Sequence, residues 1–137
     1  SSEPPQSIVL EEVINQAIAD CTEQYNTNRE LKIQRTFISH PELQAQPEVT
    51  QIILNNLLRN ACQYSEDGRI TITTSDNGLM ISNLCANPNL ETESGDEAQQ
   101  YGFGLGLYLV ETLCQQLNWP FVVTASDQRF TVSVGFV

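Results

Sequence analysis

Apolar residues recur at helical spacing in three stretches of the chain, approximately residues 10–25, 48–64 and 102–117. A period of 3.6 residues brings such positions onto one side of a helix, so the pattern predicts three amphipathic helices. The first stripe consists of Leu10, Val13, Ile14, Ala17, Ile18, Cys21 and Tyr25. Pro47 and the polar sequence SEDG bound the second helix, as expected for a helix start and end.

Alternation of apolar and polar residues predicts five strands. They occupy residues 31–38, 69–75, 79–84, 121–126 and 129–136. The sequence DNG at 76–78 is a hairpin turn signal between two of them. We expect a loop in SHPELQAQP and another, long and polar, at 85–101; long loops of this kind are often functional.

The order of these elements predicts an α/β two-layer sandwich. One mixed sheet of about five strands, with three helices on one face, would bury all the apolar stripes. Residues 1–7 are expected to form a linker or chain end, and residues 8–137 a single domain. We expect no signal peptide, because the start SSEPPQSIV lacks a basic region and a long apolar stretch.

The chain is strongly acidic, with six basic and seventeen acidic residues and a net charge of −11. This charge disfavours nucleic acid and an anionic membrane surface as direct partners. The four cysteines are far apart and form no CxxC pair. We therefore expect reduced, buried thiols in a cytosolic compartment, not a metal site or a disulfide framework.

A polar stripe accompanies the apolar stripe of the second predicted helix. Asn56, Asn60 and Tyr64 are four residues apart and share one helix face. Asparagine is a mediocre helix former, so two on one face favour a use for their amides. An amide oxygen is a suitable neutral ligand for Mg²⁺ or for water. An ordinary polar outer surface is the alternative.

Gly102, Gly104 and Gly106 precede and open the third predicted helix. Glycines allow a ligand close to the main chain, and the first amides of a helix attract anions. The stretch favours a polyphosphate site, although similar glycines also occur in plain tight turns. A polar loop precedes it, which excludes a dinucleotide fingerprint, and the GK[ST] of a Walker A loop is absent.

The order of the motifs resembles that of the catalytic ATP-binding domain of bacterial sensor histidine kinases, part of the GHKL superfamily with the Bergerat fold. NLLRNACQYS (56–65) is similar to the N box, DNG (76–78) to part of the G1 box and GFGLGLYLV (102–110) to the G2 box. The similarity covers about residues 8–137. It implies ATP or ADP with Mg²⁺ as cofactors and residues 85–101 as the ATP lid.

The resemblance also implies roles for individual residues. Asn60 would hold Mg²⁺ and Asn56 would order the phosphates, making these two the catalytic residues. Asp76 would accept a hydrogen bond from the adenine amino group, and Gly78 would let the purine lie against the backbone. Tyr64 would line the adenosine site. The phosphates would be cradled by Gly102, Gly104, Gly106 and the amide of Leu105.

Three positions depart from the family pattern. Gln63 stands where a lysine is common, Met80 stands where the G1 box has its second glycine, and residues 85–101 contain no lysine or arginine. Arg59 is the one basic residue near the proposed phosphates in the sequence, but its helical phase does not clearly point there. Each departure removes positive charge or backbone freedom, which favours weak nucleotide affinity.

These observations lead to two functional hypotheses. The first is an active kinase domain that transfers the γ-phosphoryl group of ATP to a histidine on an adjoining dimeric helical domain, and so indirectly to a response regulator. The second is a catalytically weak nucleotide-binding or interaction module. An anti-sigma serine kinase is disfavoured, because Asn56 stands where that branch has a glutamate. His40 is expected in a surface loop, and the domain in the cytoplasm without membrane contact.

Overall fold

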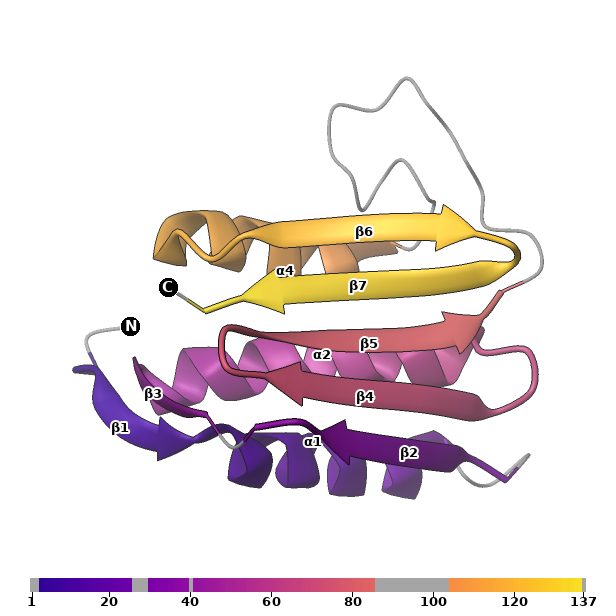
Figure 1. Cartoon of the computed structure of the whole chain (residues 1–137), viewed down its shortest axis with the longest axis horizontal. Helices are drawn as coiled ribbons and strands as arrows, with labels where there is room; N and C mark the ends of the chain where they lie inside the picture. The colour runs from indigo at the N-terminus through magenta and orange to yellow at the C-terminus, as the bar shows by residue number, and fades with distance from the viewer. Residues whose placement is uncertain (1–2, 26–29, 40, 86–103, 137) are drawn as a thin grey trace.

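The computed structural model describes residues 3–25, 30–39, 41–85 and 104–136. Its main sheet has five strands in the order β2-β4-β5-β7-β6 (Figure 1). β2 and β4 are parallel and the other neighbours are antiparallel, so the sheet is mixed as predicted. The strands are β2 (Lys32–Phe37), β4 (Arg69–Ser75), β5 (Gly78–Leu84), β6 (Phe121–Ser126) and β7 (Arg129–Gly135).

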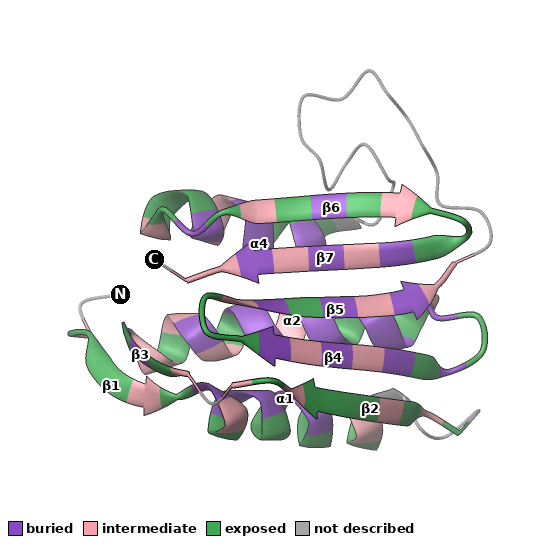
Figure 2. Ribbon diagram, viewed as in Figure 1, coloured by how far each residue is buried: buried purple, intermediate pink, exposed green. Residues whose placement is uncertain are grey.

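Three described helices cover one face of this sheet, which confirms the predicted α/β sandwich (Figure 1). They are α1 (Leu10–Tyr25), α2 (Pro47–Tyr64) and α4 (Gly104–Leu117). α2 packs between the other two and against the centre of the sheet. Strand burial alternates because only this face is covered, and the buried strand positions include Ile70, Ile72, Leu79, Ile81, Phe130, Val132 and Val134 (Figure 2).

A second, two-stranded sheet was not predicted. β1 (Gln6–Val9) pairs with β3 (Glu42–Ala45) in antiparallel register. β1 therefore includes two residues of the expected linker, and β3 lies within the expected loop. Both strands have only four residues, QSIV in β1 and ELQA in β3, which is too short for a periodic pattern to stand out from the neighbouring polar and proline residues. Leu43 and Ala45 nevertheless face the core and are buried.

The structure corrects the expectation of four reduced thiols. Cys21 of α1 and Cys62 of α2 form a disulfide bond. Both lie on the apolar stripes through which α1 and α2 pack together, and this packing brings their thiols into contact. Cys85 and Cys114 are not disulfide-bonded, and burial together with the Glu111 carboxylate raises the pKa of Cys114 to about 12. Cys114 is therefore a neutral core thiol.

Candidate functional site

The side chains of the predicted N box line a hollow of about 250 Å³ between α2 and α4. We refer to it as the α2–α4 hollow. It is lined by Asn56, Arg59, Asn60, Gln63, Tyr64, Leu105 and Gly106. The structure therefore brings together Asn56, Asn60 and Tyr64 of the predicted site with two residues of the predicted G2 box.

The sequence of α2 explains why these polar groups share one side of the helix. Its core stripe contains Ile53, Leu54, Leu57, Leu58 and Ala61, all buried against the rest of the fold. Burying each large aliphatic side chain contributes about 1.5–3 kcal/mol and fixes the rotation of the helix. The stripe from Asn56 to Tyr64 then faces α4, and Asn60 is only 7% exposed. A polar side chain held at this depth favours a functional use.

Hydrogen bonds orient the Asn56 side chain toward the hollow. Its Nδ2 donates to the Ile52 carbonyl at 2.8 Å, which directs Oδ1 to the other side. The Arg59 guanidinium donates to this Oδ1 at 3.4 Å. Arg59 thus lies beside the asparagines, a position that its helical phase did not indicate, and it brings a cation to the hollow.

The first turn of α4 approaches α2 closely because residue 106 is glycine. A Cβ atom at Gly106 would lie 3.1 Å from Asn56 Oδ1, closer than side chains normally pack. Gly104 is the first residue of α4, so this turn has backbone amides without partners inside the helix. Leu105 is 81% exposed at the rim. Gly102, His40 and residues 86–101 of the predicted lid lie outside the described residues.

The structure does not bring Asp76 and Gly78 to the α2–α4 hollow. Asp76 belongs to the turn between β4 and β5, Gly78 is the first residue of β5, and Asp76 lines a different hollow together with Trp119 and Phe136. Tyr64 lies toward the other end of β5, where the Glu66 amide donates to the Leu84 carbonyl at 3.1 Å. A Cβ at Gly78 would lie 2.8 Å from the Val134 carbonyl, so this glycine serves the β5–β7 contact.

Asn83 lies at the end of β5 that adjoins the C-terminus of α2, and sequence analysis missed it. It is 2% exposed and faces the helices, in line with Leu79 and Ile81. Its Nδ2 donates to the Leu84 carbonyl at 3.0 Å. The signal was available, because the alternation in LMISNL puts a polar amide at a core position.

No protein-family model matches the chain. A curated relative is the sensor histidine kinase ArsS of Helicobacter pylori (strain ATCC 700392 / 26695), 28% identical over 100 residues. The match covers 67% of this chain and 23% of ArsS, so the chain spans about a quarter of that relative.

Two solved structures share the fold over nearly the whole chain. The cytoplasmic segment of histidine kinase QseC superposes with a TM-score of 0.75 at 18% identity, covering 97% of this chain and 78% of QseC. The nucleotide-free catalytic domain of histidine kinase ThkA superposes with a TM-score of 0.69 at 14% identity, covering 96% of this chain and 95% of ThkA. The chain has the fold of a histidine kinase catalytic domain. This confirms the resemblance seen in the sequence.

In this histidine kinase fold, the chemistry of the α2–α4 hollow suits a magnesium-bound phosphate chain. The described residues contain no cluster of three histidine, cysteine or acidic side chains that could hold a metal. Mg²⁺ often takes only one or two protein oxygens and completes its shell with water and phosphate. The amide oxygens of Asn56 and Asn60 fit that arrangement.

Among the described helices, none is long and apolar enough to cross a membrane.

Proposed function

We propose that the chain binds Mg-ATP in the α2–α4 hollow and transfers the γ-phosphoryl group to a histidine on an adjoining domain. The main support is the convergence of Asn56, Arg59 and Asn60 with the first turn of α4 on one hollow. Phosphoryl transfer depends mainly on positioning and on neutralising charge. This hollow offers oxygen ligands, one guanidinium and unpartnered helix amides.

Each group has a distinct part in the proposal. Asn60 would hold Mg²⁺, which supplies charge neutralisation at the phosphates, and Asn56 would order the phosphates and a metal-bound water. Arg59 would provide the cation that residues 85–101 lack. The amide of Leu105, with Gly104 and Gly106, would receive phosphate oxygens at the helix start. Gly102 stays a candidate for the same cradle.

For adenine, we assign the role first given to Asp76 to Asn83. The turn that contains Asp76 lies at the far end of β5, whereas Asn83 is buried at the end near Tyr64. The Asn83 amide oxygen can accept a hydrogen bond from the adenine amino group. Guanine has a carbonyl there, so it would leave both groups unpaired, which gives strong discrimination. Tyr64 would line the adenosine side.

A second candidate function is a nucleotide-binding module with weak catalysis. Gln63 lines the α2–α4 hollow, where the family resemblance leads us to expect a lysine. An uncharged amide stabilises transferring phosphates less than an ammonium does. In either case the inferred partner is a helical dimerisation and phosphoacceptor domain, with a response regulator acting after it, in the cytoplasm.

Calorimetry on this chain tests the nucleotide site. ATP is titrated with Mg²⁺ and with EDTA into the wild type, Asn60→Ala and Asn55→Ala. Asn55 is the matched control, because it lies on the same helix but bonds to Gln51 and to Asp20 of α1. We expect Asn60→Ala to abolish the gain in affinity from Mg²⁺ and Asn55→Ala to keep it. An unchanged Mg²⁺ dependence in Asn60→Ala contradicts the proposal.

A further inference from the structure

The face of the sheet opposite the helices has no described element over it (Figures 1 and 2). The strand registers place its side chains in ordered rows. One end carries basic side chains, the middle carries hydroxyls such as Thr71, Ser82 and Thr131, and the other end carries apolar side chains. An exposed face graded in this way differs from an evenly polar surface.

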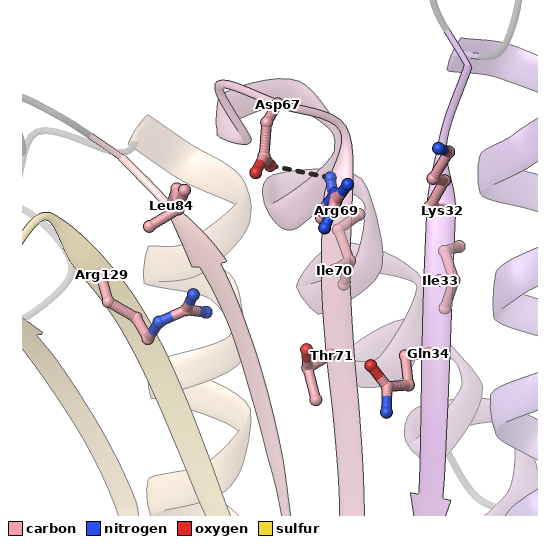
Figure 3. A pocket seen from close by; sticks show the side chains of 9 residues that line it. All are labelled: Lys32, Ile33, Gln34, Asp67, Arg69, Ile70, Thr71, Leu84 and Arg129. Carbon is pink, nitrogen blue, oxygen red and sulfur yellow. Dashed lines mark hydrogen bonds between the residues drawn. The ribbon is translucent and has the colours of Figure 1, made fainter.

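The basic end is formed by one row that crosses four neighbouring strands. Lys32 pairs with Arg69, and Arg129 pairs with Leu84. Leu84 lies opposite Arg69 and so joins the two pairs into one row. This follows from the antiparallel register of β4 and β5, in which Asn83 pairs with Ile70. These four residues line a hollow of about 660 Å³, which we call the basic hollow (Figure 3).

The basic hollow concentrates positive charge on an acidic molecule. The chain has six basic residues in total, and three of them line this hollow. Asp67 is the one acidic residue among its lining, and its carboxylate accepts a hydrogen bond from the Arg69 amide at 2.9 Å. Arg129 donates to Ser82 Oγ at 3.2 Å, so its guanidinium extends over the open face.

The opposite end of the same face is apolar. Ile38, Met80 and Val122 are 72%, 46% and 47% exposed, respectively. They line a hollow of about 360 Å³, which we call the apolar hollow. Its floor is low because Gly78 and Gly135 pair with each other there and carry no side chains. Large exposed apolar side chains around a depression are typical of an interaction site.

The spacing of the two hollows fits a helix that lies on this face and runs parallel to the strands. Leu84 is four positions after Met80 on β5, which is about 13 Å at 3.3 Å per residue. A helix covers that distance in about nine residues at 1.5 Å per residue. A helix layer is also the usual cover for an open sheet face.

We propose that this face docks an acidic amphipathic helix of a protein partner. Carboxylates at one end of that helix lie against Lys32, Arg69 and Arg129, and aliphatic side chains at its other end fill the apolar hollow. A single phosphate is too small for the basic row, which spans four strands or about 14 Å. A second copy of this chain brings the same cations and does not complement them.

The test uses a synthetic helical peptide of 18 residues as the probe. One face carries glutamates in its first half and leucines in its second half, and a matched peptide replaces the glutamates with glutamine. Binding to the full chain is measured by fluorescence anisotropy at low and high salt. We expect the glutamate peptide to bind at least ten-fold tighter than the glutamine peptide, with the difference shrinking as salt rises.

Variants locate the binding on the chain. We expect Lys32→Gln combined with Arg129→Gln to weaken binding at least ten-fold, and Met80→Gln to weaken it separately. Arg35→Gln is the matched control, because Arg35 is also on β2 but faces α1, where it bonds to Asn15. Absence of binding, equal binding of both peptides or equal loss in Arg35→Gln overturns the proposal. Dimerisation in sedimentation that Met80→Gln abolishes also overturns it.

Discussion

At the scale of single residues, the contact between Gly106 and Asn56 controls the shape of the α2–α4 hollow. A Cβ atom at residue 106 would lie only 3.1 Å from Asn56 Oδ1. Any side chain there pushes on the amide, whose other bonds to Ile52 and Arg59 resist the movement. The glycine therefore matters for the placement of one carboxamide.

The substitution Gly106→Ala distinguishes an effect on Mg-ATP affinity from an effect on the stability of the fold. Alanine in a helix is favoured over glycine by up to about 1 kcal/mol, so the melting temperature should not fall. Displacing the Asn56 amide loses about one hydrogen bond to the nucleotide, about 1 kcal/mol or five-fold in Mg-ATP affinity. Calorimetry and thermal melting measure both. Gly135→Ala, at the other end of the sheet, is the control and should keep affinity; unchanged affinity in Gly106→Ala contradicts the assignment.

A pair of substitutions tests which residue selects adenine. Asn83→Ala should weaken ATP binding by about 1–3 kcal/mol and reduce the preference for ATP over GTP, because the adenine amino group loses its acceptor. Asp76→Asn should leave both unchanged, since Asp76 lies at the turn between β4 and β5. The measurement is competition of ATP and GTP for the folded variants. If Asp76→Asn weakens ATP binding and Asn83→Ala does not, Asp76 and not Asn83 selects adenine.

These residues show what the sequence could predict about the site. The spacing of Asn56, Asn60 and Tyr64 was sufficient to place them together, because one helix fixes their geometry. The sequence singled out Arg59 as a nearby cation but did not place it at the site, because a long side chain reaches around a helix beyond its nominal phase. The position of Asp76 depends on the role of the DNG sequence, which here forms the turn of a hairpin between β4 and β5. The local sequence does not distinguish such a turn from a nucleotide-binding loop after a single strand.

At the scale of elements, the turn between α2 and β4 connects the helix layer to the sheet. Gly68 has φ of +75°, and a Cβ there would lie 2.5 Å from the Glu30 carbonyl. The backbone amide of the next residue, Arg69, donates a hydrogen bond to the Asp67 carboxylate at 2.9 Å. This turn sets the start of β4 and hence the register of β2 beside it.

Gly68→Ala is expected to destabilise the fold. Alanine is strained at this φ, and its methyl group collides with backbone that cannot easily move, which together cost at least about 1–3 kcal/mol. Urea unfolding gives the free energy; Gly135→Ala, whose added Cβ lies 3.3 Å from Pro120 Cδ but at ordinary φ, is the comparison for crowding without φ strain and should lose less stability. Equal stability of Gly68→Ala and wild type would contradict the strain argument.

Asp67 should make stability depend on pH. The hydrogen bond from the Arg69 amide lowers the pKa of this carboxyl, with a further contribution from Ser65. A lowered folded-state pKa stabilises above the unfolded value of about 3.9, and this contribution is lost as pH falls through the folded pKa. Urea midpoints from pH 6 to 2.5 should therefore fall less steeply for Asp67→Asn than for wild type. Parallel curves contradict this role.

The elements themselves were largely predictable, and the exceptions have a physical cause. The helices and the five strands of the main sheet have strong periodic patterns, because each buries one face against the same core. β1 and β3 are too short to show such a pattern and are defined by their pairing with each other. The contact between Cys21 and Cys62 likewise depends on how α1 meets α2, which neither helix sequence contains.

At the scale of the whole molecule, the two proposed sites use different layers of the sandwich. The α2–α4 hollow lies in the helix layer, whereas the basic and apolar hollows lie on the opposite face of the sheet. Substitutions in one layer therefore leave the side chains of the other in place. A partner on the open face and a nucleotide between the helices can bind at the same time.

Phosphoryl transfer by the chain alone would require a histidine acceptor within the chain. The acceptor must lie about 3–3.5 Å from the γ-phosphorus and in line with the leaving group. His40 is the one histidine of the sequence, and it precedes a proline ahead of the N-box helix, with no acidic neighbour of the phosphoacceptor type. We therefore expect no acid-labile label on this chain after incubation with radioactive Mg-ATP. The dimeric helical domain of the parent protein, added in trans, should be labelled on histidine, and Asn60→Ala should abolish that labelling. A label on His40 would instead show that the chain carries its own acceptor, and would remove the need for an adjoining domain.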